Sequence, residues 1–170
     1  VLDFTFDFKD KIIDKFISTY EAGGTPNPCI DCNRFMKFDK LMQFAKEKQL
    51  DFVVTGHYAR IENKNGRYLL KKARDLSKDQ SYVLYSLTQE QLAHTLFPLG
   101  DYEKSEIRKI AEENGFVNSK KPDSQDICFV PDGDYVKFME NYTGKHYEKG
   151  NYLDKNGNVI GTHEGAVHYT

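Results

Sequence analysis

The sequence predicts a fold of the α/β class. Two observations carry this prediction: apolar residues recur at helical spacing in two early segments, and a short run of aromatic and β-branched residues follows the second segment. A helix that leads into a strand, with further strands and helices behind it, is the order that builds an α/β sheet.

Composition and charge limit the class of protein. The 170 residues are 39% hydrophobic and 29% charged, which suits one globular domain and part of another. The formal net charge is -2, so any nucleic-acid surface must be local. No segment reaches the roughly 20 apolar residues of a membrane span, and the first residues lack a signal-peptide pattern. We therefore expect a cytoplasmic protein with no membrane partner.

Two helices and a strand are predicted in the first third of the chain. Apolar residues at helical spacing predict an amphipathic helix over residues 9–21, which the glycines at 23 and 24 bring to an end. The same period over residues 35–45 predicts a second helix, and residues 51–55 are predicted to form a short buried strand. The segment between the helices is predicted to be a rigid loop, because two prolines restrict its backbone.

A basic hairpin is predicted next. Residues 58–62 and 67–70 fit strands, joined by a turn at Asn63-Lys64-Asn65-Gly66. From residue 60 to residue 78 the chain carries seven basic and two acidic residues, a strip that suits phosphate contacts, although an ordinary solvated surface has the same composition. The basic residues are Arg60, Lys64, Arg67, Lys71, Lys72, Arg74 and Lys78.

Two short helices are predicted beyond the hairpin. Thr88 and Gln91 form a capping box that predicts a helix to His94, and residues 105–114, followed by Gly115, predict the other. The second helix is expected to bury Ile107, Ile110 and Ala111.

The C-terminal region is predicted to differ in composition. Residues 126–130 are predicted to form a strand, residues 135–142 a short helix, and residues 151–161 a hairpin around the two-residue turn Asn156-Gly157. Because no long helix follows, we place a domain boundary near residue 133.

Three cysteines are the first candidates for chemistry. Cys29 and Cys32 stand in a Cys-x-x-Cys pattern, which suits a redox pair, a bound metal ion, or two inert thiols. Cys128 stands in an apolar run beside carboxylates, so nothing local favours its thiolate. An odd number of cysteines argues against a secreted disulfide framework. A zinc site would need a fourth ligand at a spacing that the sequence lacks.

A second candidate site follows the predicted strand, at the edge where open α/β sheets bind ligands. Gly56 would let a ligand approach the backbone, although a glycine turn with a surface histidine at His57 fits the same pattern. Lys78, Asp79 and Gln80 add polar groups that can read a ribose or a base edge.

Five motifs occur in one order along the chain: Gly-Gly-Thr-Pro-Asn-Pro-Cys-Ile-Asp-Cys-Asn, Thr-Gly-His-Tyr-Ala-Arg, Lys-Asp-Gln-Ser-Tyr, Ser-Gln-Asp-Ile-Cys-Phe and Gly-x-His-x-Gly-x-x-x-Tyr-Thr. In this combination the sequence resembles the tRNA-specific 2-thiouridylases over essentially its whole length. The resemblance implies a Rossmann-like PP-loop ATPase fold, of the adenine nucleotide alpha-hydrolase type, in residues 1–132. It implies the start of a small central α+β domain in residues 133–170.

The resemblance also implies that the chain is a fragment. The family's pyrophosphate loop would precede Val1, and its β-barrel domain would follow Thr170. Without the loop that cradles ATP phosphates, the fragment alone is expected to be inactive. We further expect sheet residues such as Phe52 and Val54 to be exposed, and the fragment to self-associate.

The implied reaction is a sulfur transfer to tRNA. Mg-ATP adenylates the C2 oxygen of the wobble uridine, and persulfide sulfur then replaces that oxygen to give 2-thiouridine. Cys128 corresponds to the persulfide-bearing cysteine, and Cys32 to a second catalytic cysteine that can pair with Cys128 as a disulfide. A cysteine desulfurase or a sulfur-relay protein would donate the sulfur.

Further site residues follow from the resemblance. Several members of the family have Asp where this chain has Cys29, so the role of this thiol is open. The implied contacts are the target base for Asn27, Pro28 and Cys29, ATP for Gly56, and tRNA for His57, Lys78, Asp79 and Gln80.

Two alternatives stay open. Cys29, Cys32 and Cys128 could bind an iron–sulfur cluster as three thiolate ligands. The chain could also be a non-catalytic thiol or metal-binding module that binds RNA.

Overall fold

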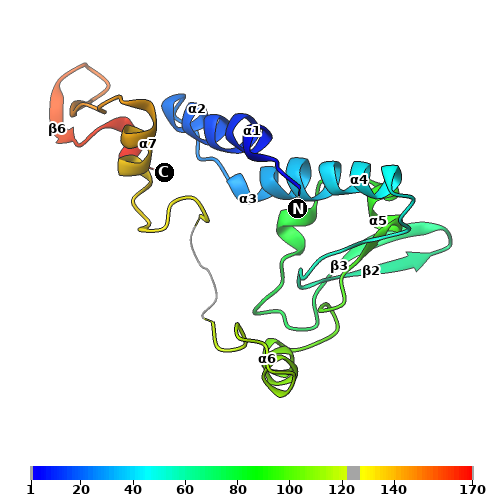
Figure 1. The fold of residues 1–170 in the computed structure, drawn as a ribbon. Coiled ribbons are helices and arrows are strands. Elements are labelled where there is room, and N and C mark those ends of the chain that lie inside the picture. The colour runs from blue at the N-terminus through cyan, green and yellow to red at the C-terminus, as the bar shows by residue number, and fades with distance from the viewer. Residues whose placement is uncertain (1, 122–126, 170) are drawn as a thin grey trace. The chain divides into compact units, whose positions relative to one another are not determined.

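The computed structural model describes residues 2–121 and 127–169 (Figure 1). They belong to two compact units, one formed by Val1–Pro28 with Ser124–Thr170 and the other by Cys29–Asp123. The second unit combines helices with a parallel strand pair and an antiparallel hairpin. The predicted α/β class is therefore confirmed.

The first unit begins with one continuous helix. It consists of α1 (Thr5–Phe8), the π-helical stretch η1 (Lys9–Asp14) and α2 (Lys15–Glu21). The predicted helix over residues 9–21 is confirmed, and it starts earlier than predicted. The chain turns away at Gly23, whose φ of +78° suits glycine.

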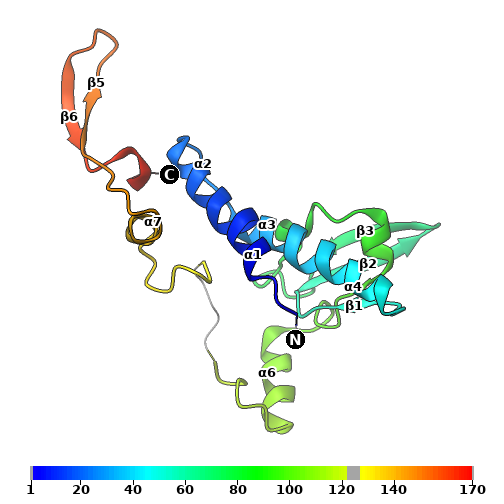
Figure 2. The ribbon, with the colours of Figure 1, turned by 45° about the horizontal axis from the view of Figure 1, so that its top comes forward.

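The C-terminal part of the first unit contains α7 (Tyr135–Thr143), the hairpin of β5 (Gly150–Leu153) and β6 (Val159–His163), and the short helix η4 (Ala166–His168) (Figure 2). The predicted helix and hairpin are confirmed. The connection is longer than the predicted two-residue turn, because the Asp154 carboxylate accepts hydrogen bonds from the backbone N–H groups of Asn156 and Asn158 and shapes a wider loop. The core of this unit consists of Phe16, Ile17, Tyr20, Val136, Met139 and Val167.

The predicted strand over residues 126–130 is wrong. Residue 126 lies outside the described residues, and residues 127–130 form a turn in which the Val130 N–H donates to the Ile127 carbonyl at 2.9 Å. The apolar character that suggested a strand serves tertiary packing instead, because Val130 is buried and Phe129 packs against the core of the unit.

A second continuous helix starts at Pro28. It consists of α3 (Pro28–Asp31), the π-helical stretch η2 (Cys32–Lys40) and α4 (Leu41–Glu47). The rigid loop predicted around the cysteines is therefore wrong from Pro28 onward. Proline suits the first position of a helix, because its fixed φ is helical and the N–H that it lacks would have no partner there.

The strands of the second unit are short. β1 (Val53–Val54) pairs in parallel with β4 (Thr95–Leu96), so only part of the predicted strand is regular. Phe52 and Val54 are 48% and 58% exposed, as expected. The predicted hairpin is confirmed by β2 (Ala59–Lys64) and β3 (Arg67–Lys72), with positive φ at both turn residues, Asn65 and Gly66.

Three short helices complete the second unit: η3 (Ser81–Leu84), α5 (Gln89–Ala93) and α6 (Lys104–Glu113). The capping box predicted at Thr88 is present on α5. In Figures 1 and 2, α4 runs beside β1, and α5 lies beside β3. The core residues are Phe38, Ala59, Val83, Leu84 and Phe97.

The expected burial on α6 is wrong. Ile107 and Ala111 are only half-buried and Ile110 is 43% exposed, so α6 exposes the side that its spacing predicts to be apolar. Periodicity marks an apolar face, but it does not determine whether another element covers that face. Separately, no helix in residues 2–121 and 127–169 is both long enough and apolar enough to cross a bilayer.

Candidate functional site

The helix that starts at Pro28 carries two of the three thiols. Cys29 is exposed and Cys32 is half-buried, directly after the exposed Asn27 and the buried Pro28. Cys29 lies in the first turn of this helix, and Cys32 lies one turn further along it.

Asn33 fixes the backbone between these thiols. Its side chain is 4% exposed, and its amide nitrogen donates to the Cys29 carbonyl at 2.9 Å. Its amide oxygen is buried without a hydrogen-bond partner among residues 2–121 and 127–169. Asn33 is not among the residues predicted from the sequence, although its place directly after the second cysteine is a usable signal.

Cys128 is exposed in the turn at residues 127–130. The next residue, Phe129, anchors this turn through an edge contact with the Phe16 ring and a tilted contact with the Phe138 ring, at ring-centroid distances of 5.4 and 5.2 Å. Cys128 belongs to the first unit and Cys32 to the second, so their pairing stays a prediction. Within the described part of the chain, no three His, Cys, Asp or Glu side chains gather as metal ligands would.

His57 lies in the loop that follows β1, with its side chain buried. It is 6% exposed, so the surface histidine considered in the sequence analysis is wrong. Its Nδ1 is 2.8 Å from the Thr55 hydroxyl and its Nε2 is 3.5 Å from the Lys37 ammonium. Burial, and then the charge of Lys37, lowers the pKa of His57 to about 4. Because an ammonium only donates, Nε2 accepts from Lys37, and the neutral ring carries its proton on Nδ1.

Gly56 precedes His57 in this loop. A Cβ built at Gly56 would meet only the Leu99 side chain, at an ordinary 3.6 Å, whereas one at Gly100 would lie 1.9 Å from the Ala59 carbonyl oxygen. The fold therefore requires glycine at 100 but tolerates a side chain at 56, which leaves room for a ligand at the Gly56 backbone. Lys37 brings a positive charge to the same loop, and the sequence analysis did not select it.

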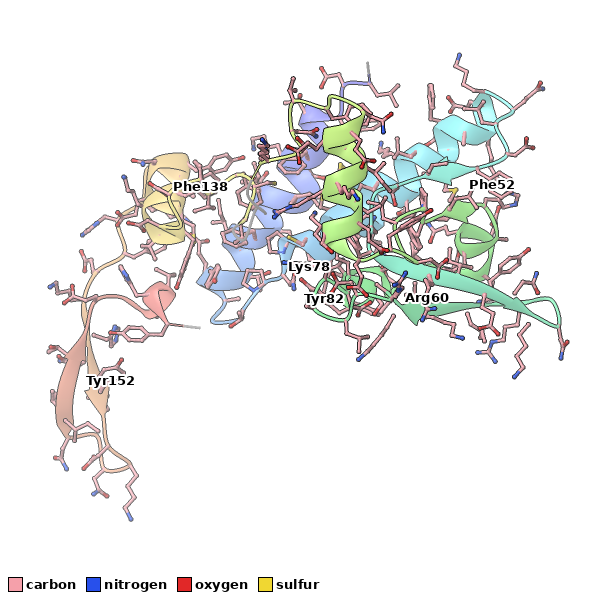
Figure 3. The ribbon with its side chains drawn as sticks, turned by 90° about the horizontal axis from the view of Figure 1, so that it is seen from below. Phe52, Arg60, Lys78, Tyr82, Phe138 and Tyr152 are labelled. Atoms are coloured by element: carbon pink, nitrogen blue, oxygen red, sulfur yellow. The ribbon has the colours of Figure 1, made fainter. Side chains whose placement is uncertain are left out.

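Asp79 and Gln80 shape the loop between β3 and η3. The Asp79 carboxylate accepts from the Ala73 N–H at 2.8 Å and from the Ser81 hydroxyl at 2.7 Å. Gln80 pairs with Tyr58 twice, since its side-chain oxygen accepts from the Tyr58 N–H at 3.0 Å and its own N–H donates to the Tyr58 carbonyl at 2.8 Å. The carboxylate and amide oxygens are thus engaged by the protein; Figure 3 labels Lys78 at the start of this segment and Tyr82 just after it.

The β2–β3 hairpin presents a basic outer face. The register pairs Arg60 with Lys71 and Lys64 with Arg67, on the face opposite the core residues Ala59, Ile61 and Leu70. Arg60 and Lys71 have acidic partners in Asp101 and Glu62. Lys64 and Arg67, at the tip, make no ion pair with any described residue, so the tip carries uncompensated positive charge.

Comparisons with known proteins give the family context. Residues 1–132 match the family model described as the tRNA methyl transferase HUP domain. Relatives named tRNA-specific 2-thiouridylase MnmA are 49% identical in Lachnoclostridium phytofermentans, 52% in Clostridioides difficile and 51% in Clostridium kluyveri, each over the whole of this chain. The chain spans about half the length of these relatives, 48% in each. The resemblance seen in the five motifs is confirmed.

Proposed function

Because the chain belongs to the tRNA methyl transferase HUP domain family, whose Rossmann-like fold it shares, we propose that it serves ATP-dependent 2-thiolation of tRNA. The activity is that of a transferase which converts the wobble uridine to 2-thiouridine. The observation that carries this proposal is the cysteine-bearing start of the helix at Pro28, within a chain about half identical to proteins named for that modification. No observation favours the non-catalytic module.

The chemistry assigns different roles to the two catalytic thiols. The C2 oxygen of uridine attacks the α-phosphorus of ATP and releases pyrophosphate, which makes that oxygen a leaving group. The terminal sulfur of a persulfide on Cys128 attacks C2 and expels AMP. The Cys32 thiolate then attacks the Cys128 sulfur, which releases 2-thiouridine and leaves a Cys32–Cys128 disulfide. A dithiol reductant restores both thiols.

The loop after β1 is proposed as part of the ATP site. Gly56 tolerates close approach of a ligand, and the Lys37 ammonium supplies positive charge beside it. The buried His57 is neutral and accepts a hydrogen bond from Lys37. We therefore propose that His57 orients the Lys37 ammonium toward tRNA or nucleotide phosphates, rather than contacting tRNA itself. Mg²⁺ would accompany ATP on its phosphates.

The basic surface is proposed as part of the tRNA-binding surface. Lys64 and Arg67 at the hairpin tip have no acidic partner among the described residues, so they are available for backbone phosphates. Lys78 adds a third cation. Asp79 and Gln80 hold the loop that carries Lys78, while Asn27, Pro28 and Cys29 border Cys32 as the proposed contacts to the target base.

The sulfur is proposed to come from another protein. A cysteine desulfurase or a sulfur-relay protein supplies the persulfide, and the reaction takes place in the cytoplasm.

A domain boundary is proposed near residue 133. The family match ends at residue 132, which supports a boundary between the catalytic domain at 1–132 and a central domain from 133.

Nucleoside analysis of tRNA tests this function. The full-length protein is incubated with unmodified tRNA, Mg-ATP and a persulfide donor, and 2-thiouridine is expected to form only when ATP is present. Formation of a methylated uridine without sulfur would favour a methyl transfer instead. Iron and sulfide analysis of anaerobically purified protein separates the cluster alternative, which requires stoichiometric iron and sulfide.

A further inference from the structure

Two tyrosine rings stand exposed beside the loop of Lys78 to Gln80. Tyr82 and Tyr85 are 62% and 70% exposed, and neither side chain has a hydrogen bond or ring contact with another described residue. A phenol ring has a large apolar surface, so two neighbouring rings left in water suggest a surface that binds a partner.

The backbone beneath these rings is held firmly. Tyr82 lies in η3 and Tyr85 follows it, while the residues between them, Val83 and Leu84, are 4% and 0% exposed. The Ser81 hydroxyl donates to Asp79 at 2.7 Å, and the Val83 N–H donates to the Gln80 carbonyl at 3.2 Å. The rings therefore sit on an ordered support, which reduces the entropy lost when a ligand stacks on them.

The 3₁₀ geometry of η3 places the two rings on one side. In such a helix, side chains three residues apart eclipse each other, and the rise between them is about 6 Å. That spacing is close to twice the roughly 3.4 Å between stacked bases, so one planar base fits between the rings or against either of them. Tyr85 continues this geometry, because its φ of −59° and ψ of −22° are helical.

We propose that Tyr82 and Tyr85 form a stacking platform for unpaired bases of the RNA substrate. This inference rests on the proposed function, since the wobble uridine lies in a single-stranded loop. η3 packs against η2, whose first residue is Cys32, and against β3 of the basic hairpin. Lys78 and Tyr82, both labelled in Figure 3, are only four residues apart, so a cation and an aromatic ring leave the same short segment. Aromatic rings that bind bases next to cations that bind phosphates are typical of single-stranded RNA sites.

A tryptophan reporter tests stacking directly. These 170 residues contain no tryptophan, so Tyr82→Trp in the 170-residue chain introduces a single fluorophore at the platform. Titration with a short single-stranded RNA is expected to quench this fluorescence, whereas an RNA of equal length with abasic sites, which keeps the phosphates, quenches little. Tyr102→Trp is the matched control, because Tyr102 is 42% exposed in the same unit but lies outside the platform. Equal quenching by intact and abasic RNA, or quenching of the control alone, would overturn the proposal.

Affinity measurements extend the test. Tyr82→Ala is expected to weaken binding of single-stranded RNA by about 5-fold or more, while Tyr82→Phe, which keeps the ring, stays within about 2-fold. Unchanged affinity in both variants, with retained circular dichroism, would mean that the rings bind something other than RNA bases. Binding is measured without ATP or a sulfur donor, so failed thiolation with intact stacking would reject only the proposed function. Intact thiolation without stacking would reject only the platform.

Discussion

The two cysteine-bearing segments proposed to act together are held in opposite ways. Cys32 lies in regular secondary structure, in a helix whose first turns are fixed by Pro28 and by the buried Asn33. Cys128 lies in an irregular turn, fixed by the aromatic packing of Phe129. The first arrangement depends on backbone hydrogen bonds and the second on side-chain burial.

This difference has a consequence for how each thiol can act. The helix holds Cys32 half-buried in regular secondary structure, which suits the attacking role proposed for this thiol. The turn exposes Cys128 while Val130, two residues on, is buried, which suits the proposed role of accepting sulfur from another protein. The proposed division of roles, with Cys32 as nucleophile and Cys128 as sulfur carrier, is consistent with their different places in the fold.

Acidification is expected to have the largest effect, and only on the unit that holds the Cys32 helix. The pKa of His57 is about 4 in the folded state and near 6.5 when unfolded, so between these values the unfolded chain binds the proton more tightly. The contribution of about 3 kcal/mol is present above pH 6.5 and is lost as pH falls toward 4. The free energy of unfolding, measured by denaturant at a series of pH values, should fall less steeply on acidification in His57→Asn than in the unchanged protein. If this pH dependence is unchanged in His57→Asn but reduced in the control, His94→Asn, the buried neutral ring is disproved.

Removing the aromatic anchor of the Cys128 turn should destabilise the first unit and leave the second unit unchanged. Phe129→Ala deletes a half-buried ring with three aromatic neighbours and is expected to cost about 2–3 kcal/mol in the first unit. Hydrogen exchange should report faster opening of α2 and α7 but unchanged protection in the β2–β3 hairpin. Phe116→Ala, which removes a 59% exposed ring, serves as the control and should have little effect. Equal loss of protection in the hairpin would contradict the separation of the two units.

Removing the buried amide should have a smaller effect on the Cys32 helix. Asn33→Ala removes the hydrogen bond to the Cys29 carbonyl, but it also removes a buried oxygen that has no partner among the described residues. The net cost is expected to be about 1 kcal/mol. Thiol alkylation should quicken at Cys29 and Cys32 but not at Cys128. A large stability loss with unchanged alkylation would mean that Asn33 supports the core rather than the thiols.

The Gly56 position should be nearly neutral for folding. A Cβ there meets only Leu99 at an ordinary distance, so Gly56→Ala is expected to change the free energy of unfolding by less than about 0.5 kcal/mol. Nucleotide affinity of the full-length protein should nevertheless fall, because the methyl group occupies the space proposed for ATP. Gly100→Ala, which clashes with the Ala59 carbonyl, is the contrasting variant and should unfold the second unit. Unchanged ATP affinity in Gly56→Ala would remove Gly56 from the proposed nucleotide site.

The sequence correctly predicted those elements whose formation is determined by residues close together in the chain. The helix ending at Glu21, the hairpin turn at Asn65-Gly66 and the capping box at Thr88 depend on neighbouring residues, and each is present. Tertiary burial is less accessible to such signals. The burial of His57, the exposed side of α6 and the turn at Cys128 depend on residues distant in sequence, which no local period encodes.

The cysteine motif shows how a local signal can also mislead. Two prolines suggested a rigid loop, but the second proline is the first residue of a helix, a position that proline favours. The motifs predicted the candidate site, but they did not predict Lys37, Asn33 or Tyr82. Lys37 and Asn33 become candidates through the contacts of their side chains in the fold, and Tyr82 through its exposure.

Mapping of the persulfide tests the central claim most directly. The full-length enzyme and its Cys32→Ser, Cys128→Ser and Cys29→Ser variants are loaded with sulfur by a desulfurase, and intact peptides are analysed by mass spectrometry alongside 2-thiouridine formation. We expect persulfide on Cys128 in every protein except Cys128→Ser, and thiolation reduced by about 10³-fold or more in the Cys32 and Cys128 variants, with tRNA affinity within about 2-fold. Cys29→Ser should retain measurable activity. Persulfide absent from Cys128, or equal and total loss in all three variants, would contradict the division of roles between the helix thiol and the turn thiol.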